Sequence, residues 1–313
     1  MTWRGRRIAW WGRSVIALAV LLAAIAGLYV WATRTGSVAT LDFVDSLFTQ
    51  ARDRVHVRYG KLPSQQLFVY PGRGAEKLPV VVFVHGGGWV HGSPADYGFV
   101  ARNIAPHGYA VVLAGYRLGP EGRFPAMLED TAAAVAWTRA HAAEYGGDPD
   151  RILLMGHSAG AYNVAMVALD KKWLAAQQLD THFIKGVIGL SGPYDFYPFK
   201  GEAERKAFAG WPQPKDTQPV NFARGDAPPM LLINGADDDV VRPRNALALG
   251  RALTAAGAQN VPGIFPGLDH SQVLMDLARP FDRDPRVKSA VVAFLAESTV
   301  LPPTSAPVQP AKR

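Results

Sequence analysis

The amino-acid sequence predicts an α/β protein in which a mostly parallel sheet is covered by helices on both faces. Of the 313 residues, 49% are hydrophobic and 19% are charged, which is typical of a globular chain with a sizeable core. Short runs that are apolar throughout alternate with longer segments of helical periodicity. Strands of that kind are typical of parallel sheets buried on both faces, and no internal repeat or second domain boundary interrupts the alternation.

The predicted elements begin with a helical segment at 41–51, which we expect to lie over the body or near a membrane. Segments 55–59 and 66–70 alternate like strands and are joined by a turn. Further strands are predicted at 80–84, 110–114, 152–155, 186–190, 230–234 and 263–265, and helices near 99–105, 127–143, 159–169, 246–256 and 287–296. The loops that follow the parallel strands should therefore meet at one edge of the sheet, where ligands bind in open α/β folds.

Charge is concentrated at the two ends of the chain. The formal net charge is +7, and six cations near the termini supply most of it: Arg4, Arg6, Arg7, Arg13, Lys312 and Arg313. The body has no basic face of the kind that nucleic-acid binding requires, so no nucleic-acid partner is expected. The absence of cysteine is compatible with an oxidising compartment and with the cytosol alike.

The N-terminal arginines precede about 20 uncharged residues, 14–33, which is enough to span a bilayer. Tyr29 and Trp31 near the end of this run suit a membrane interface. Residues 1–35 are therefore predicted to be a retained membrane anchor, a transmembrane helix that leaves the body of the chain on the periplasmic or extracytoplasmic side. A cleaved signal peptide and a buried soluble helix are the alternatives.

Residues 36–300 are predicted to form one domain, followed by a proline-rich tail at 301–313 that is expected to be disordered. A long connection within the domain, 194–229, is rich in proline and aromatic residues. Connections of this length often form lids or pocket walls, so the segment is predicted to be a cap or pocket insertion. Its aromatic side chains either line an acyl or alcohol pocket or cover the sheet: Phe196, Tyr197, Phe199, Phe208 and Trp211.

A serine flanked by glycines joins a predicted strand to a predicted helix, in the sequence Gly156-His157-Ser158-Ala159-Gly160. The glycines permit a tight turn and leave the serine hydroxyl exposed, and the helix N-terminus favours negative charge beside it. Ser158 is the predicted nucleophile. The main-chain N–H of Ala159 is a predicted donor to an oxyanion.

A glycine-rich loop follows the strand at 80–84, in the sequence His85-Gly86-Gly87-Gly88-Trp89. Glycine weakens strands, so three in succession favour a loop whose N–H groups approach an oxyanion closely. A phosphate loop is the alternative, but no lysine follows at the required spacing. Gly87 and Gly88 are the predicted donors. His85, Gly86 and Trp89 are expected to support the loop.

An acidic residue and a histidine, the two further groups that a serine nucleophile needs, follow later predicted strands. Three consecutive acids, Asp237, Asp238 and Asp239, follow the strand at 230–234, and the residues alone do not distinguish them. His270 follows the strand at 263–265. The chain order of serine, acid and histidine is that expected of α/β hydrolases, in which the histidine acts as general base and a carboxylate orients it.

With these motifs together, the chain resembles the α/β-hydrolase superfamily over roughly residues 55–298. Within it, the sequence is similar to the lipase and carboxylesterase group related to hormone-sensitive lipase. The lipase and carboxylesterase group often has an aspartate directly before the nucleophile. This chain has a histidine there, which looks more like the feruloyl and acetyl-xylan-type esterases and the kynurenine formamidases. The resemblance also rests on residues 116–121 (Tyr-Arg-Leu-Gly-Pro-Glu), 124–125 (Phe-Pro), Asp130 and 190–195 (Leu-Ser-Gly-Pro-Tyr-Asp).

The resemblance implies a role for particular residues. A Gly-x-x-Asp-x-x-Val pattern places the acid at Asp238, between Gly235 and Val241. Tyr116 and Asp130 resemble residues that support the fold beside the glycine loop. The short stretch between the predicted anchor and the first strand implies a small cap.

These features predict a serine hydrolase that cleaves carboxylic esters with short acyl chains through Ser158, His270 and Asp238. An arylformamidase, another amidase or a small peptidase using the same residues is the alternative. The expected partner is a small-molecule ester, and neither a metal nor a cofactor is expected.

Overall fold

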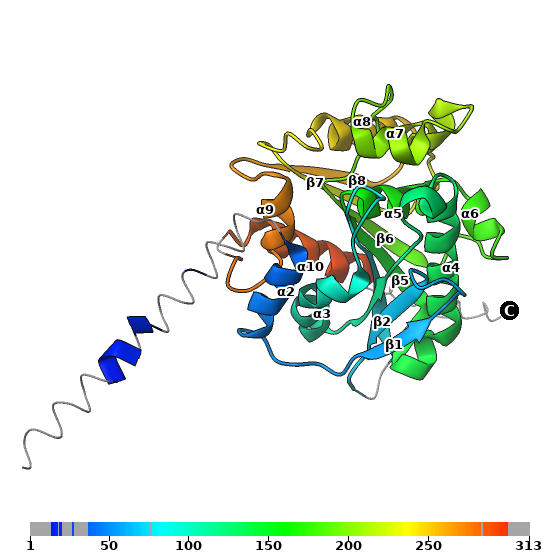
Figure 1. The fold of residues 1–313 in the computed structure, drawn as a ribbon. Coiled ribbons are helices and arrows are strands. Elements are labelled where there is room, and N and C mark those ends of the chain that lie inside the picture. The colour runs from blue at the N-terminus through cyan, green and yellow to red at the C-terminus, as the bar shows by residue number, and fades with distance from the viewer. Residues whose placement is uncertain are drawn as a thin grey trace, which may run out of the picture.

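In the described part of the chain, eight strands form a single sheet, seen through the middle of the molecule in Figure 1. The spatial order is β1-β2-β4-β3-β5-β6-β7-β8. Strand β2 is antiparallel to both of its neighbours, and all other pairs are parallel. The strands are β1 Val55–Arg58, β2 Gln66–Tyr70, β3 Leu78–Val84, β4 Ala110–Ala114, β5 Gly147–His157, β6 Ile184–Leu190, β7 Met230–Gly235 and β8 Asn260–Phe265.

The predicted strands are confirmed, with one notable difference in length. Strand β5 spans Gly147–His157, whereas apolar residues alone predicted 152–155. Its polar first half pairs with β3 through Leu78 and Gly147, and the register then shifts before Val80 pairs with Ile152. The first residues of β5 are polar, so the search for apolar runs did not find them. Their strand conformation is held by main-chain pairing, which leaves no hydrophobic pattern in the sequence.

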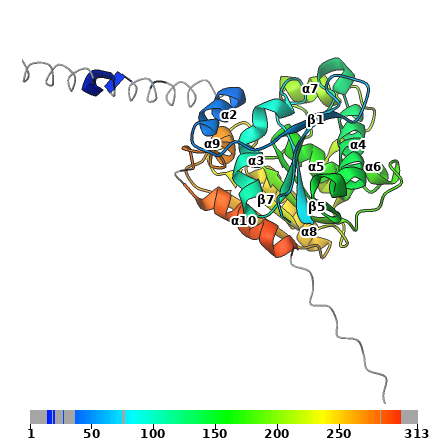
Figure 2. The ribbon, with the colours of Figure 1, turned by 90° about the horizontal axis from the view of Figure 1, so that it is seen from below.

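Helices cover both faces of the sheet, as Figures 1 and 2 show. One face carries α2 Val38–Ser46, α3 Gly98–Ile104, α9 His270–Met275 and α10 Arg286–Thr299. The other carries α4 Ala126–His141, α5 Ala159–Leu169, α6 Lys172–Ala175, α7 Glu202–Phe208 and α8 Arg244–Ala255. The predicted three-layer arrangement is therefore confirmed.

Each central strand contributes side chains to two separate cores. In β3, Val80 and Val82 join the core beneath α4 and α5, whereas Val81 and Phe83 join the core beneath α3 and α10. Because successive side chains point to opposite faces of a sheet, a strand covered on both faces must be apolar at every position. This requirement explains the uninterrupted apolar runs of the sequence.

The structure describes residues 14–17, 19, 20, 27, 37–74, 77–282 and 284–299. Most of the predicted membrane span at 14–33 lies outside these residues, as does the predicted tail at 301–313. Over the described ranges, no helix has both the length and the apolar character needed to cross a bilayer.

The aromatic residues of the 194–229 insertion form a cluster over α5. Phe196 and Phe208 have ring centroids 5.3 Å apart, and both rings pack on Tyr162 of α5. Phe208 also meets Trp89 edge to face, with the ring centroids 4.8 Å apart. None of the five aromatic residues singled out in this insertion lines the pocket described below. Four of them pack in or against the core, whereas Tyr197 is 49% exposed.

Candidate active site

The turn between β5 and α5 holds Ser158 in a strained conformation. Its φ of 54° and ψ of −120° are rare for a residue with a side chain. The flanking glycines allow close packing: a Cβ on Gly160 would lie 2.0 Å from the carbonyl oxygen of Val84, and a Cβ on Gly156 would lie 2.4 Å from Gly160. The turn is therefore pressed against β3, which leaves the serine side chain at the sheet edge.

His270 lies between Ser158 and Asp238, hydrogen-bonded to both. Its Nε2 is 3.0 Å from Oγ of Ser158, and its Nδ1 is 2.8 Å from Oδ2 of Asp238. The three side chains come from the turn after β5, the loop after β7 and the start of α9, which are far apart in sequence. With Nδ1 donating to the carboxylate, Nε2 is left to accept the serine proton.

Of the three consecutive acids, only Asp238 is buried, at 3% exposure, whereas Asp237 and Asp239 are exposed. One Asp238 oxygen accepts from the main chain of Val241, 2.7 Å away, and the other from His270. Burial alone raises the pKa of this carboxyl, but the hydrogen bonds and the charge of His270 outweigh it, so the pKa lies below its usual value. Asp238 is thus held ionised beside the histidine.

His157, inside the turn, contacts His270 directly. Its Nε2 lies 3.1 Å from the main-chain oxygen of His270, and the two rings are 4.8 Å apart. Burial, together with the neighbouring His270, lowers the pKa of His157 to about 3. The ring is therefore neutral at physiological pH and, since a carbonyl only accepts, Nε2 carries the proton.

The glycine loop after β3 runs beside the serine with an unusual backbone. Gly87 and Gly88 have φ values of 115° and 59°, and a Cβ on Gly87 would lie 1.9 Å from the carbonyl oxygen of His91. The N–H of Gly86 donates to the hydroxyl of Tyr97, 3.3 Å away. Among the described residues, the N–H groups of Gly87 and Gly88 have no acceptor, which leaves them available to a ligand.

Two aromatic contacts support this loop. Trp89 is buried, and its indole N–H donates to Asn163 of α5, 3.1 Å away. His85 stacks on Tyr116 with ring centroids 4.6 Å apart, and the Tyr116 hydroxyl donates to the His85 carbonyl. Burial lowers the pKa of His85 to about 4. Both side chains thus contact residues that flank the loop, and no hydrogen bond joins either of them to Ser158.

Asp130 also supports the loop region, through Arg117. Its Oδ2 accepts from both the main-chain N and Nε of Arg117, each 2.8 Å away, and its Oδ1 accepts from Gln65. This arrangement agrees with the supporting role that the resemblance implies.

A cavity of about 540 Å³ opens beside Ser158. Its lining includes the glycine loop and His270, together with apolar residues of α2 and α9: Val38, Ala39, Leu41, Leu274 and Met275. Sequence patterning missed these wall residues because α2 and α9 reach the pocket only through the folded topology. Within the described ranges, no cluster of three or more His, Asp or Glu side chains is arranged to hold a metal ion.

The sheet order, the strained serine turn and the histidine-carboxylate pair define an α/β-hydrolase fold. Residues 67–253 match the BD-FAE family, which is more than half of the chain, so the protein belongs to that family. Both Ser158 and Asp238 lie within the matched region.

Curated relatives are similar over most of this chain. Esterase LipC of Mycobacterium tuberculosis is 31% identical over 249 residues, which cover 72% of this chain and 61% of the relative. The isoprenylcysteine alpha-carbonyl methylesterase ICME of Arabidopsis thaliana is 28% identical over 253 residues, covering 74% of this chain and 59% of the relative. The chain thus spans about three fifths of the length of these relatives.

Solved structures share the fold. A truncated carbohydrate esterase from gut microbiota superposes with a TM-score of 0.68 at 21% identity, covering 80% of this chain and 96% of that one. The propionate-bound esterase Est2 of Thermogutta terrifontis has a TM-score of 0.66 at 24% identity, with the same coverage. At these identities the likeness establishes the architecture.

Proposed function

We propose that the protein is a serine esterase that hydrolyses carboxylic esters with short acyl groups. The observation that carries the proposal is the continuous hydrogen-bonded series from Ser158 through His270 to Asp238 at the side of an open pocket. The names of the curated relatives, esterase and methylesterase, support the same reaction class.

In the first half of the proposed reaction, Oγ of Ser158 attacks the ester carbonyl while Nε2 of His270 takes the hydroxyl proton. The negative charge on the carbonyl oxygen is stabilised by the N–H groups of Gly87, Gly88 and Ala159. Each such donor contributes about 10²–10³ in rate. Collapse of the tetrahedral intermediate releases the alcohol, which receives the proton from His270.

In the second half, His270 removes a proton from water, and the resulting hydroxide attacks the acyl-serine. Asp238 stabilises the imidazolium in both halves because its carboxylate is already ionised and hydrogen-bonded to Nδ1. The products are a carboxylic acid and an alcohol, and Ser158 regains its proton.

The test is hydrolysis of p-nitrophenyl esters from acetate to decanoate by the full chain and by its Ser158→Ala variant. We expect the variant to lose nearly all activity, and acetate to butyrate to be the best substrates. Equal rates for folded parent and variant on every ester would refute the esterase proposal. Formamides and peptides assayed in parallel would reveal the amidase alternative.

We also propose that residues 1–35 anchor the protein in a membrane. The support is the arginine-flanked run of about 20 uncharged residues. After cell fractionation, the full chain should remain in the membrane pellet through a high-salt wash. Recovery of a shortened chain in the soluble fraction would contradict this proposal and indicate a cleaved signal.

A further inference from the structure

Helix α2 forms one wall of the pocket. Residues Ser37, Val38, Ala39 and Leu41 all line the cavity, and Leu41 is buried. Val240, in the loop that carries Asp238, lines the same cavity and is 68% exposed. The rim of the pocket is therefore apolar at both α2 and the loop that carries Asp238.

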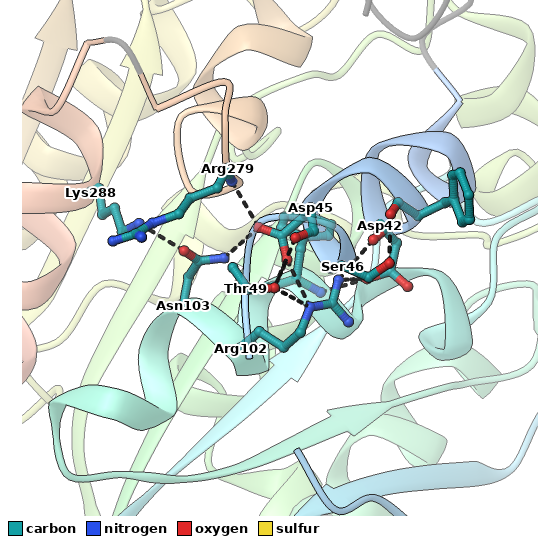
Figure 3. Close-up of polar contacts among 10 residues, drawn as sticks. Asp42, Asp45, Ser46, Thr49, Arg102, Asn103, Arg279 and Lys288 are labelled. Atoms are coloured by element: carbon teal, nitrogen blue, oxygen red, sulfur yellow. Dashed lines mark hydrogen bonds and ion pairs between the residues drawn. The ribbon is translucent and has the colours of Figure 1, made fainter. Parts of the chain in front are cut away.

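Buried polar contacts fix α2 to the hydrolase body, as Figure 3 shows. Asp45 is fully buried, and its two oxygens accept from the side chains of Arg102 and Asn103 and from the main chain of Arg279, at 2.7 to 2.8 Å. Asp42 accepts a second hydrogen bond from Arg102, 2.7 Å away. Because these partners belong to α3 and to the segment after α9, α2 and the pocket are held together as one unit.

The face of α2 that points away from the body is apolar. Ala39, Phe43 and Leu47 are spaced four residues apart, so they form one stripe along the helix. Phe43 is 56% exposed, Leu47 is 58% exposed, and the neighbouring Phe48 is 45% exposed. The stripe begins at the pocket rim, since Ala39 belongs to both. Exposed apolar patches of this kind mark interaction surfaces.

The length of the chain limits how far this face can lie from the uncharged N-terminal run. That run ends at Thr33, and the pocket lining begins at Ser37. Four residues span at most about 14 Å when fully extended. If the run crosses a bilayer, the pocket mouth is therefore held close to the membrane surface.

We propose that the outer face of α2 lies on the lipid surface and that the substrate is an amphiphilic ester that resides in the bilayer. This inference rests on the proposed esterase activity and membrane anchor. The apolar stripe enters the boundary between headgroups and acyl chains, as amphipathic interfacial helices do. Such a substrate reaches Ser158 along the apolar rim without crossing water.

The experiment compares two esters with the full chain in vesicles of diether phosphatidylcholine, a lipid without ester bonds. Hexadecyl acetate partitions into the bilayer, and p-nitrophenyl acetate is taken from water. Hydrolysis of hexadecyl acetate consumes one water and yields acetate and hexadecanol. The ratio of the two rates cancels differences in the amount of active enzyme.

The first variant carries a flexible 20-residue Gly/Ser insertion between Gly36 and Ser37. Such a linker has a root-mean-square length of roughly 25 Å, so it frees the pocket from the surface. We expect the rate ratio to fall at least tenfold, with p-nitrophenyl acetate hydrolysis by the same sample as the reference rate. An unchanged ratio would overturn the inference.

The second variant, Phe43→Ser with Leu47→Ser, removes the apolar stripe without touching the buried contacts of Asp45. We expect the ratio to fall several-fold, whereas it should be unchanged in the matched control Val261→Ser, which alters an equally exposed apolar residue on β8. Equal ratios in the double variant and the control would overturn the inference, as would dimerisation of the parent through this face. If the parent hydrolyses neither ester, the proposed function itself fails.

Discussion

The serine half and the histidine half of the site are held in place by different forces. Around Ser158, main chain packs on main chain, and there is no room for a Cβ at Gly156 or Gly160. His270, by contrast, begins a short helix, and polar contacts with Asp238 and His157 hold this residue in place. The first half should therefore be sensitive to added atoms, and the second to lost hydrogen-bond partners and to pH.

The largest expected effect comes from removing the carboxylate of Asp238 in the histidine half of the site. Asp238→Asn removes the carboxylate that holds the histidine tautomer, and we expect kcat/KM for p-nitrophenyl acetate to fall about 10⁴-fold. The matched control is Asp237→Asn, which changes an exposed neighbour and should leave kcat/KM unchanged. Similar losses in both variants would show that Asp238 is not the orienting acid.

The serine half of the site should be destabilised when one methyl group is added at Gly160. In Gly160→Ala the new Cβ would lie 2.0 Å from the carbonyl oxygen of Val84, which neither backbone can avoid without moving. Overpacking of this kind costs about 3 kcal/mol or more, so thermal unfolding should occur roughly 10 °C lower. Gly210→Ala is the control, because nothing lies within 4 Å of its added Cβ. A Gly160→Ala protein as stable as the control would contradict the packing account.

His157 joins the two halves, and its loss should have a moderate effect. His157→Phe keeps a ring but removes the donor to the His270 carbonyl, a hydrogen bond with a net worth of about 1 kcal/mol. We expect kcat/KM to fall about fivefold, with substrate KM little changed. His157→Gln retains a donor and should recover part of the loss. If Gln performs no better than Phe, the contact does not position His270.

The smallest expected effect concerns stability near the end of α9. Asp276 is 5% exposed, and one of its oxygens has no hydrogen-bond partner. Burial, and secondarily the charge of Asp284, raise the pKa of Asp276 to about 7. The folded state thus retains this proton up to a higher pH than the unfolded state does, so Asp276 should destabilise the protein progressively as pH rises from about 4 to 7.

The variant Asp276→Asn removes this charge and tests the point directly. Its melting temperature should exceed that of the parent by a few degrees at pH 8, and the two should be nearly equal at pH 4. Thermal melts across this range provide the measurement. A difference that is independent of pH would mean that ionisation of Asp276 is not its cause.

Sequence patterning predicted the sheet and the strand-end motifs because both depend on local chemistry. Apolar runs mark strands buried on two faces, and glycines mark the turns. It could not choose among Asp237, Asp238 and Asp239, since their difference lies in burial. It also left the aromatic residues of the 194–229 insertion undecided and gave α2 no role in the pocket, because both depend on contacts between distant segments.

The position of α2 in the chain has a consequence for how the pocket can be altered. The family match covers residues 67–253, so α2 precedes the matched region, whereas α9 with His270 follows it. Exchange or redesign of one nine-residue helix can therefore alter what enters the pocket while the bond-breaking residues stay untouched. The pocket wall that α2 contributes and the hydrogen-bonded series of Ser158, His270 and Asp238 thus come from separate segments of the chain, and α2 is the segment to alter for a different pocket shape.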